Sequence, residues 1–372
     1  MKVPAAGIYF PEEDRKEILS KIDKALESGQ LTLGKSGEEF EKKFAEYVGA
    51  KHAIAVNSGT SALEIPLRIF DVRGKNVVVP TNTFFATPAA VIHAGGKVKF
   101  AEADSETFSL DVDDISEKID KDTKGVIVVH VGGIVTPRIE EIKKLCDDNN
   151  LFLLEDAAHA HGSSLDGKKA GTFGAAASFS FYPTKVMTSG EGGMIVTDDP
   201  EVQKKAVIFR DQGKSGFLGN VHVELGHNWR MSELHAILGL SQLKRLDEFI
   251  ERRRGIAKIY DERLKDIDGI KGLAMPDGVR SNYYKYIALL DKNIDRSAIK
   301  KELKEKYGVG LSGEVYELPC HLQPVFKDLG YKEGDFPVAE EICKRHVCLP
   351  VFATMTEDQA NYVVDSLKEV LG

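Results

Sequence analysis

The chain has little of what marks a metal protein, a membrane protein or a nucleic-acid binder. Only four of its 372 residues are cysteines, and none stands in a Cys-x-x-Cys pair, which argues against a zinc ribbon or a dithiol redox site. The longest apolar runs, such as residues 125–135, fall well short of the roughly 20 residues that a membrane-spanning helix needs. With a formal net charge of -8 and intermingled charges, the sequence favours a small-molecule partner over nucleic acid.

Three further signatures are missing. The N-terminus reaches the charged stretch 12–16 without the apolar core of a secretory signal peptide, so we expect a cytoplasmic protein. No glycine cluster has the G-x-G-x-x-G spacing of a dinucleotide fingerprint, which disfavours a nicotinamide dehydrogenase. His159 and His161 lack a surrounding set of ligands at metal-binding spacing, so we expect no metal.

What the sequence does contain is an alternation of short apolar runs with helical patterns. We expect strands at 53–56, 76–79, 97–102, 125–131 and 151–154, and helices at 12–28, 38–48, 62–69, 87–93, 113–119 and 138–149. This spacing is typical of βαβ units, and it predicts an α/β fold with a mostly parallel central sheet and helices on both faces. Ligands of such sheets bind at the carboxyl ends of the strands.

A second, smaller unit follows a long helical pattern that begins near Ser232. Beyond it the chain predicts strands at 283–290 and 347–350 and helices at 296–307 and 357–371. We therefore expect a large domain over residues 1–245 and a small C-terminal α+β domain over residues 246–372.

The stretch around Lys185 has the form of a strand that delivers a side chain into a cleft. A short aromatic and β-branched run ends at Pro183, the lysine follows, and Gly190-Glu191-Gly192-Gly193 precedes a second apolar run. A lysine on such a loop suits Schiff-base chemistry on a carbonyl, and the glycines allow backbone or ligand to approach closely. The alternative is a solvated surface lysine, since most lysines are exposed.

Other polar residues follow predicted strands. A strand that turns through Ser58-Gly59-Thr60-Ser61 into a helix offers free backbone N–H groups, which would bind an anion such as phosphate or would simply be capped by a hydroxyl. Asp156 follows a strongly apolar strand, so its carboxylate needs a cation or a strong donor unless it caps a turn.

Seven segments in order resemble one family, the DegT/DnrJ/StrS aminotransferases, which are fold-type I pyridoxal-phosphate enzymes acting on nucleotide-linked sugars. The segments are 58–63, 83–87, 155–162, 178–185, 190–193, 228–231 and 318–324. The resemblance extends from Phe40 to the C-terminus. It implies pyridoxal 5'-phosphate as cofactor and a homodimer with shared active sites.

The resemblance also implies a role for individual residues. Lys185 would hold the cofactor as an internal aldimine and then shuttle a proton, while Asp156 would face the pyridine nitrogen. His159 stands where the family usually has glutamine and would contact the phenolic oxygen of the cofactor. The resemblance further implies that the cofactor phosphate is bound by Thr60, Ser61 and Ser180, and by Asn228 from the neighbouring subunit. Phe84 would stack on the pyridine ring.

Two features of the resemblance concern the sugar. In the segment 130–133, the aromatic residue that often follows His130 in the family is missing. His321 is either a sugar contact or a packed loop histidine. The implied reaction moves an amino group from an amino acid, expected to be L-glutamate, to a nucleotide-diphosphate ketosugar. One alternative is a sugar dehydratase of the same family, against which Lys185 argues because that relative has histidine there. The other is a non-catalytic sugar-nucleotide sensor on the same fold, which has no need for these residues together.

Overall fold

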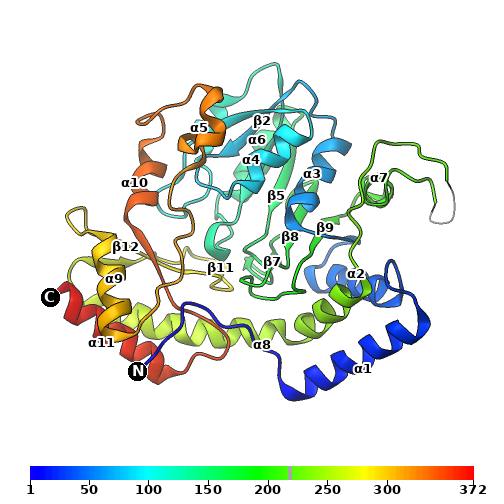
Figure 1. Cartoon of the computed structure of the whole chain (residues 1–372). Coiled ribbons are helices and arrows are strands. Elements are labelled where there is room, and N and C mark those ends of the chain that lie inside the picture. The colour runs from blue at the N-terminus through cyan, green and yellow to red at the C-terminus, as the bar shows by residue number, and fades with distance from the viewer. Residues whose placement is uncertain (217–219) are drawn as a thin grey trace.

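A mixed seven-stranded sheet forms the centre of the larger part of the molecule in a computed structural model that describes residues 1–216 and 220–372 (Figure 1). In spatial order the strands are β1 (His52–Val56), β9 (Gly193–Thr197), β8 (Ala176–Ser180), β5 (Phe152–Asp156), β4 (Thr123–Val129), β2 (Asn76–Pro80) and β3 (Lys97–Ala101). Only β9 runs antiparallel to its neighbours, and the other pairs are parallel. The predicted α/β fold with a mostly parallel sheet is confirmed.

Helices cover both faces of this sheet because successive side chains of its strands point in opposite directions. On β4, Val126 and Val128 join one buried apolar cluster, whereas Ile127 and Val129 join another. The first face is covered by α2 (Lys35–Val48), α5 (Val112–Lys118), α6 (Ile139–Asp148) and the first half of α8 (Glu233–Arg263). The second face is covered by α3 (Gly59–Ile69), α4 (Ala86–His93), α7 (Pro200–Arg210) and α10 (Pro337–Arg345). Burial on both sides explains why the strands are continuously apolar.

The C-terminal part builds a second core of its own. Its antiparallel sheet has the order β10 (Ile270–Gly272), β12 (Tyr286–Leu290) and β13 (His346–Leu349). Helices α9 (Arg296–Tyr307) and α11 (Glu357–Leu371) pack on it together with the second half of α8. Val3 also joins this core and pairs with Val309, so both chain ends lie at this C-terminal core (Figure 1).

The helix α8 links the two cores without interruption, as the long pattern after Ser232 predicted. Ser232 caps its N-terminus, and the buried carboxylate of Glu233 accepts backbone N–H bonds from Gly34, Ser36 and Gly37 at 2.8, 2.9 and 3.0 Å. Helix α1 (Glu12–Ser28) lies along α8 in Figure 1. The predicted domain boundary at residue 245 falls inside this continuous helix and stays a prediction.

Several short elements have no counterpart in the sequence prediction, and the helices α7 and α10 were not predicted either. A small sheet of β6 (Ser164–Leu165), β7 (Lys168–Lys169) and β11 (Val279–Arg280) joins the chain after β5 to the chain before β12. The 3-10 turns are η1 (Val131–Gly133), η2 (Leu264–Asp266), η3 (Cys320–Leu322) and η4 (Pro324–Leu329). Within the described ranges, no helix combines the length and the apolar character that crossing a membrane requires.

Candidate active site

Lys185 lies on the tight loop after β8, where its N–H donates to the Tyr182 carbonyl at 2.9 Å. Its side chain is partly buried, and its Nζ sits 4.8 Å from the centre of the Tyr284 ring. Burial lowers the pKa of Lys185 to about 8, although the negative charge of Asp156 acts in the opposite direction. About a tenth of this amine is therefore neutral at pH 7 and about half at pH 8, and the neutral form is the nucleophile.

Two glycines, Gly193 and Gly59, let strands β9 and β8 approach the first turn of α3 closely. A Cβ placed on Gly193 would lie 2.2 Å from the carbonyl oxygen of Ser58, and one on Gly59 would lie 2.7 Å from the Cβ of Ser180. Only glycine permits these approaches. They place Ser180 directly against the first turn of α3.

The start of α3 shows which of its hydroxyls caps the helix. The cap is Ser58, whose Oγ accepts from the N–H of Ser61 at 3.1 Å. The hydroxyl of Ser61 bonds to Asn57 Oδ1 at 2.7 Å, and Thr60 has no capping role. The N-terminal end of a helix carries partial positive charge, so this turn next to Ser180 has the donors of a phosphate site.

Asp156 is the last residue of β5 and is only 5 % exposed. Its Oδ2 accepts from the Thr87 hydroxyl at 2.8 Å, and its Oδ1 accepts from the Ala158 N–H at 3.2 Å. Burial raises the pKa of this carboxyl above its ordinary value, and the two bonds together with the charge of Lys185 oppose that rise only in part. No lysine or arginine in the described ranges forms an ion pair with it, which leaves room for a cationic ligand atom.

His159 lies three residues further, buried between aromatic rings. Its ring stacks on Tyr284 with centroids 4.2 Å apart and faces Tyr316 at 6.1 Å. Its Nδ1 accepts the N–H of Gly132 at 3.4 Å, so the proton of the neutral ring resides on Nε2. Burial lowers the pKa of His159 well below its ordinary value. The histidine is therefore a neutral donor, as the glutamine usual at this position would be.

Two predicted residues are exposed, and a third is already engaged in hydrogen bonds. The ring of Phe84 is 61 % exposed, and Asn228 is exposed on the segment that leads to α8. His321 is buried, with Nδ1 at 2.6 Å from the Thr81 hydroxyl and Nε2 at 3.1 Å from Glu340. These bonds are those of a packed loop histidine, and its contact with the sugar stays a prediction.

Sequence reasoning missed the residues that surround the predicted ones. Thr87, Tyr284 and Tyr316 contact Asp156, Lys185 or His159, yet two of them come from the small domain. Thr87 stood within the resembling segment 83–87 and could have been found there. Nothing near Tyr284 or Tyr316 in the chain signals a site.

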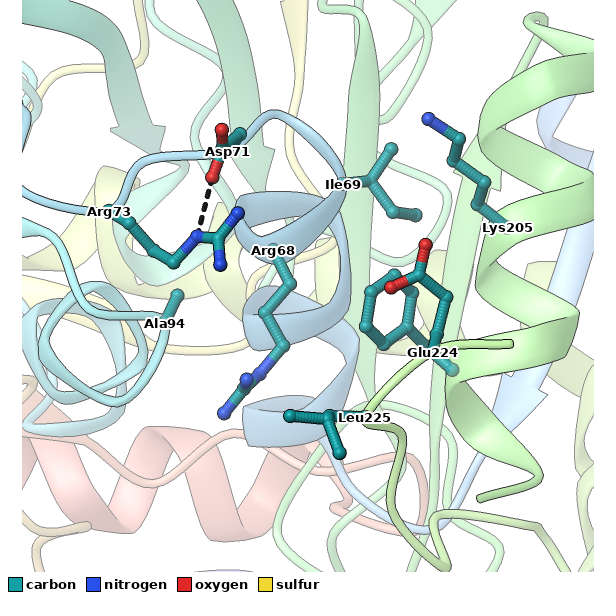
Figure 2. Close-up of a pocket in the computed structure, with 9 residues that line it drawn as sticks. Arg68, Ile69, Asp71, Arg73, Ala94, Lys205, Glu224 and Leu225 are labelled. Atoms are coloured by element: carbon teal, nitrogen blue, oxygen red, sulfur yellow. Dashed lines mark hydrogen bonds and ion pairs between the residues drawn. The ribbon is translucent and has the colours of Figure 1, made fainter. Parts of the chain in front are cut away.

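The candidate site is distinct from the cavity of about 310 Å³ shown in Figure 2. That cavity lies between the end of α3, the end of α4, α7 and the segment around Leu225. Its arginines are paired, since Arg73 binds Asp71 at 2.7 Å and Arg68 binds Glu64 at 2.6 Å. It contains none of the predicted site residues.

The fold is that of the fold-type I pyridoxal-phosphate-dependent transferases. The loop of Lys185, the buried Asp156 and the hydroxyl-bearing N-terminus of α3 lie at the carboxyl ends of the strands of this sheet. The chain belongs to the DegT/DnrJ/EryC1/StrS aminotransferase family, whose sequence model matches residues 12–368. Its class is thus that of an aminotransferase enzyme.

Individual relatives agree with this membership. The chain is 35% identical over 371 residues to the spore coat polysaccharide biosynthesis protein SpsC of Bacillus subtilis, covering 96% of this chain and 95% of that protein. It is 33% identical to the dTDP-3-amino-3,4,6-trideoxy-alpha-D-glucose transaminase of Micromonospora megalomicea, covering 97% and 96%. The crystal structure of S. venezuelae DesV in complex with a ketimine intermediate superposes with a TM-score of 0.93 at 29% identity, covering 99% and 98%.

Proposed function

We propose that this protein is a pyridoxal-phosphate-dependent aminotransferase that moves an amino group from L-glutamate to a nucleotide-diphosphate ketosugar. The observation that carries the proposal is Lys185, a partly buried amine on the loop after β8 whose pKa burial lowers to about 8 against the opposing charge of Asp156. The substrate class is supported by the name of the Micromonospora relative, a transaminase of a dTDP-linked amino sugar. Amino sugar nucleotides of this kind would serve polysaccharide biosynthesis, as the name of SpsC suggests.

The residues present fit the cofactor. Lys185 would hold it covalently through Nζ, and Asp156 would accept a hydrogen bond from its protonated ring nitrogen. The first turn of α3 with Thr60, Ser61 and Ser180 would bind its phosphate. Phe84 would cover the ring, and Nε2 of His159 would donate to its phenolic oxygen. When bound, the cofactor supplies a ring that withdraws electrons from the substrate carbon.

The chain's own residues would perform the proton transfers. Lys185 becomes a general base once its amine is neutral, and its pKa of about 8 makes that form available at moderate pH. Asp156 keeps a proton on the ring nitrogen, because a buried carboxylate stabilises a neighbouring cation. The stacked rings of His159 and Tyr284 would exclude water from this side of the site.

The exposed position of Asn228 supports a homodimer with shared sites as part of the proposal. In one protomer Asn228 lies on the surface. In the proposed dimer it would reach the cofactor phosphate held by the neighbouring subunit.

The test combines a covalent assay with a substrate screen. Borohydride reduction of the purified protein with pyridoxal phosphate should attach the cofactor to Lys185, as located by peptide mass spectrometry. Lys185→Ala should abolish amino-sugar formation from glutamate and a panel of ketosugar nucleotides, because the covalent anchor and the base are lost together. The control is Lys292→Ala, which removes an exposed lysine paired with Glu341. Substantial turnover by Lys185→Ala would refute the assignment.

A further inference from the structure

A chain of two hydroxyls supports Asp156 from the protein interior. Oγ1 of Thr87 lies 2.8 Å from Oδ2 of Asp156, and Oγ1 of Thr83 lies 2.8 Å from Oγ1 of Thr87. Thr87 is 0% and Thr83 is 2% exposed, so water does not compete for these bonds. Thr87 lies in the first turn of α4 and Thr83 just before it, which brings the two hydroxyls to the same side of the chain.

The direction of this chain depends on the charge of the carboxyl group. An ionised carboxylate can only accept, so the single proton of Thr87 must point to Asp156. Thr87 then has only its lone pairs left for Thr83, and Thr83 must donate to it. Two hydroxyl dipoles therefore align toward Oδ2, and hydrogen bonds aligned in series strengthen each other.

The other side of the carboxylate is held less firmly. Its Oδ1 receives the N–H of Ala158 at 3.2 Å, which is longer than the bond from Thr87. Both groups belong to the same short stretch of backbone, so this contact is local to the turn after β5. The Thr87 bond is the one that ties the carboxylate to a different element of the fold.

We propose that Thr87, backed by Thr83, is a positioning residue that keeps Asp156 ionised and aimed at the ring nitrogen of the cofactor. The inference rests on the proposed function, since it needs the cofactor at this site. Without the hydroxyl the carboxylate becomes a stronger base, and the proton it shares with the ring nitrogen moves onto the carboxyl oxygen. The ring then loses its positive charge and much of its ability to withdraw electrons.

The experiment uses the full-length protein with pyridoxal phosphate labelled with ¹⁵N in the ring. Thr87→Val keeps the branched shape but removes the hydroxyl, and Thr87→Ser keeps the hydroxyl. Two quantities are measured, the ¹⁵N chemical shift of the bound ring nitrogen against pH and the dissociation constant of the cofactor. We expect Thr87→Val to move the ring-nitrogen titration to lower pH and to weaken cofactor binding about tenfold. Thr87→Ser should restore both values.

A matched control is available within the chain. Thr107 is also buried, and its Oγ1 donates to the carboxylate of Asp104 at the same distance of 2.8 Å, but on the loop between β3 and α5. Thr107→Val should leave both measured quantities unchanged. Thr83→Val, one bond further from Asp156, should produce the same shift as Thr87→Val at reduced size, about threefold in affinity.

The outcomes separate the inference from the function on which it rests. If the wild-type protein does not attach the cofactor to Lys185, the proposed function fails. If it does, but Thr87→Val leaves the ring-nitrogen titration unchanged, the inference alone is overturned. Weaker binding that Thr87→Ser does not restore would also overturn it, because such a loss reflects packing. Should Thr87→Val fail to fold, Thr83→Val decides, and an unchanged titration in that variant rejects the inference.

Discussion

Glu155 and Asp156 are neighbours on β5, yet their carboxylates have different numbers of hydrogen-bond partners. The oxygens of Glu155 accept from the N–H groups of Gly171, Phe173 and Gly174, each at 2.7 Å, and lie 2.9 Å from His130 Nε2. Among the described residues, Asp156 accepts bonds from Thr87 and Ala158 alone. Because successive residues of a strand point to opposite faces, one acid serves the loop behind the sheet and the other serves the site.

The difference teaches how to separate a structural acid from a functional one. A carboxylate has about four lone-pair positions, and Glu155 has a partner for each of them. Asp156 is equally buried and has capacity left for a ligand. In the sequence the two residues are simply an adjacent Glu-Asp pair, so only their hydrogen-bond partners tell them apart.

Glu155→Gln should destabilise the folded protein, because Glu155 is the structural acid of the pair. The new amide NH₂ would face backbone N–H donors, so the folded state should lose about 3–5 kcal/mol of unfolding free energy, measured by urea denaturation. The control Glu141→Gln changes an exposed glutamate paired with Arg138 and should cost less than about 1 kcal/mol. Equal losses in the two variants would contradict this account.

Asp156→Asn should impair catalysis without destabilising the folded protein. The amide cannot hold the ring nitrogen in its protonated form, so kcat should fall about a hundred- to thousandfold. The unfolding free energy should stay the same or rise slightly, because a buried charge is removed. Measuring both quantities on each variant gives the sharpest form of the comparison, and it fails if Asp156→Asn unfolds as readily as Glu155→Gln.

The pH at which Lys185 becomes reactive should depend on Asp156 and not on Glu155. Its amine becomes reactive as the pH rises through its pKa of about 8, instead of the ordinary 10.5. The acylation rate of Lys185 in the cofactor-free protein, followed by peptide mass spectrometry, should therefore show a midpoint near 8. Since the charge of Asp156 raises this pKa, Asp156→Asn should lower the midpoint, whereas Glu155→Gln should not.

His159→Gln should give the smallest effect on the ligand-facing side. Burial keeps the pKa of His159 well below its ordinary value, so the ring is already a neutral donor at neutral pH, as glutamine is. At each pH from 6 to 8, the cofactor affinities of the wild type and of His159→Gln should differ by less than about threefold. A loss of affinity near pH 6 that only the wild type shows would disprove the neutral assignment.

Much of this molecule follows from its sequence because local patterns specify local structure. The apolar alternation predicted five of the seven strands of the central sheet, and helix α1 begins and ends where the periodicity places it. Asp156 and Lys185 were found because they follow predicted strands. Their partners were not: Thr87 and Asp156 are 69 residues apart, and only the fold brings them together. Helix α10, with nine residues, was not predicted from its pattern.

The continuous helix α8 gives the two cores one common axis. Its 31 residues span about 46 Å, and Glu233 fixes one end to the chain around Gly34. The other half is built into the C-terminal core, where Ile256, Ala257 and Tyr260 are buried. A tilt of about 5° at the Glu233 end would carry the far end of the helix through about 4 Å. A small change in how Glu233 is held would therefore displace the C-terminal core by several ångströms relative to the central sheet.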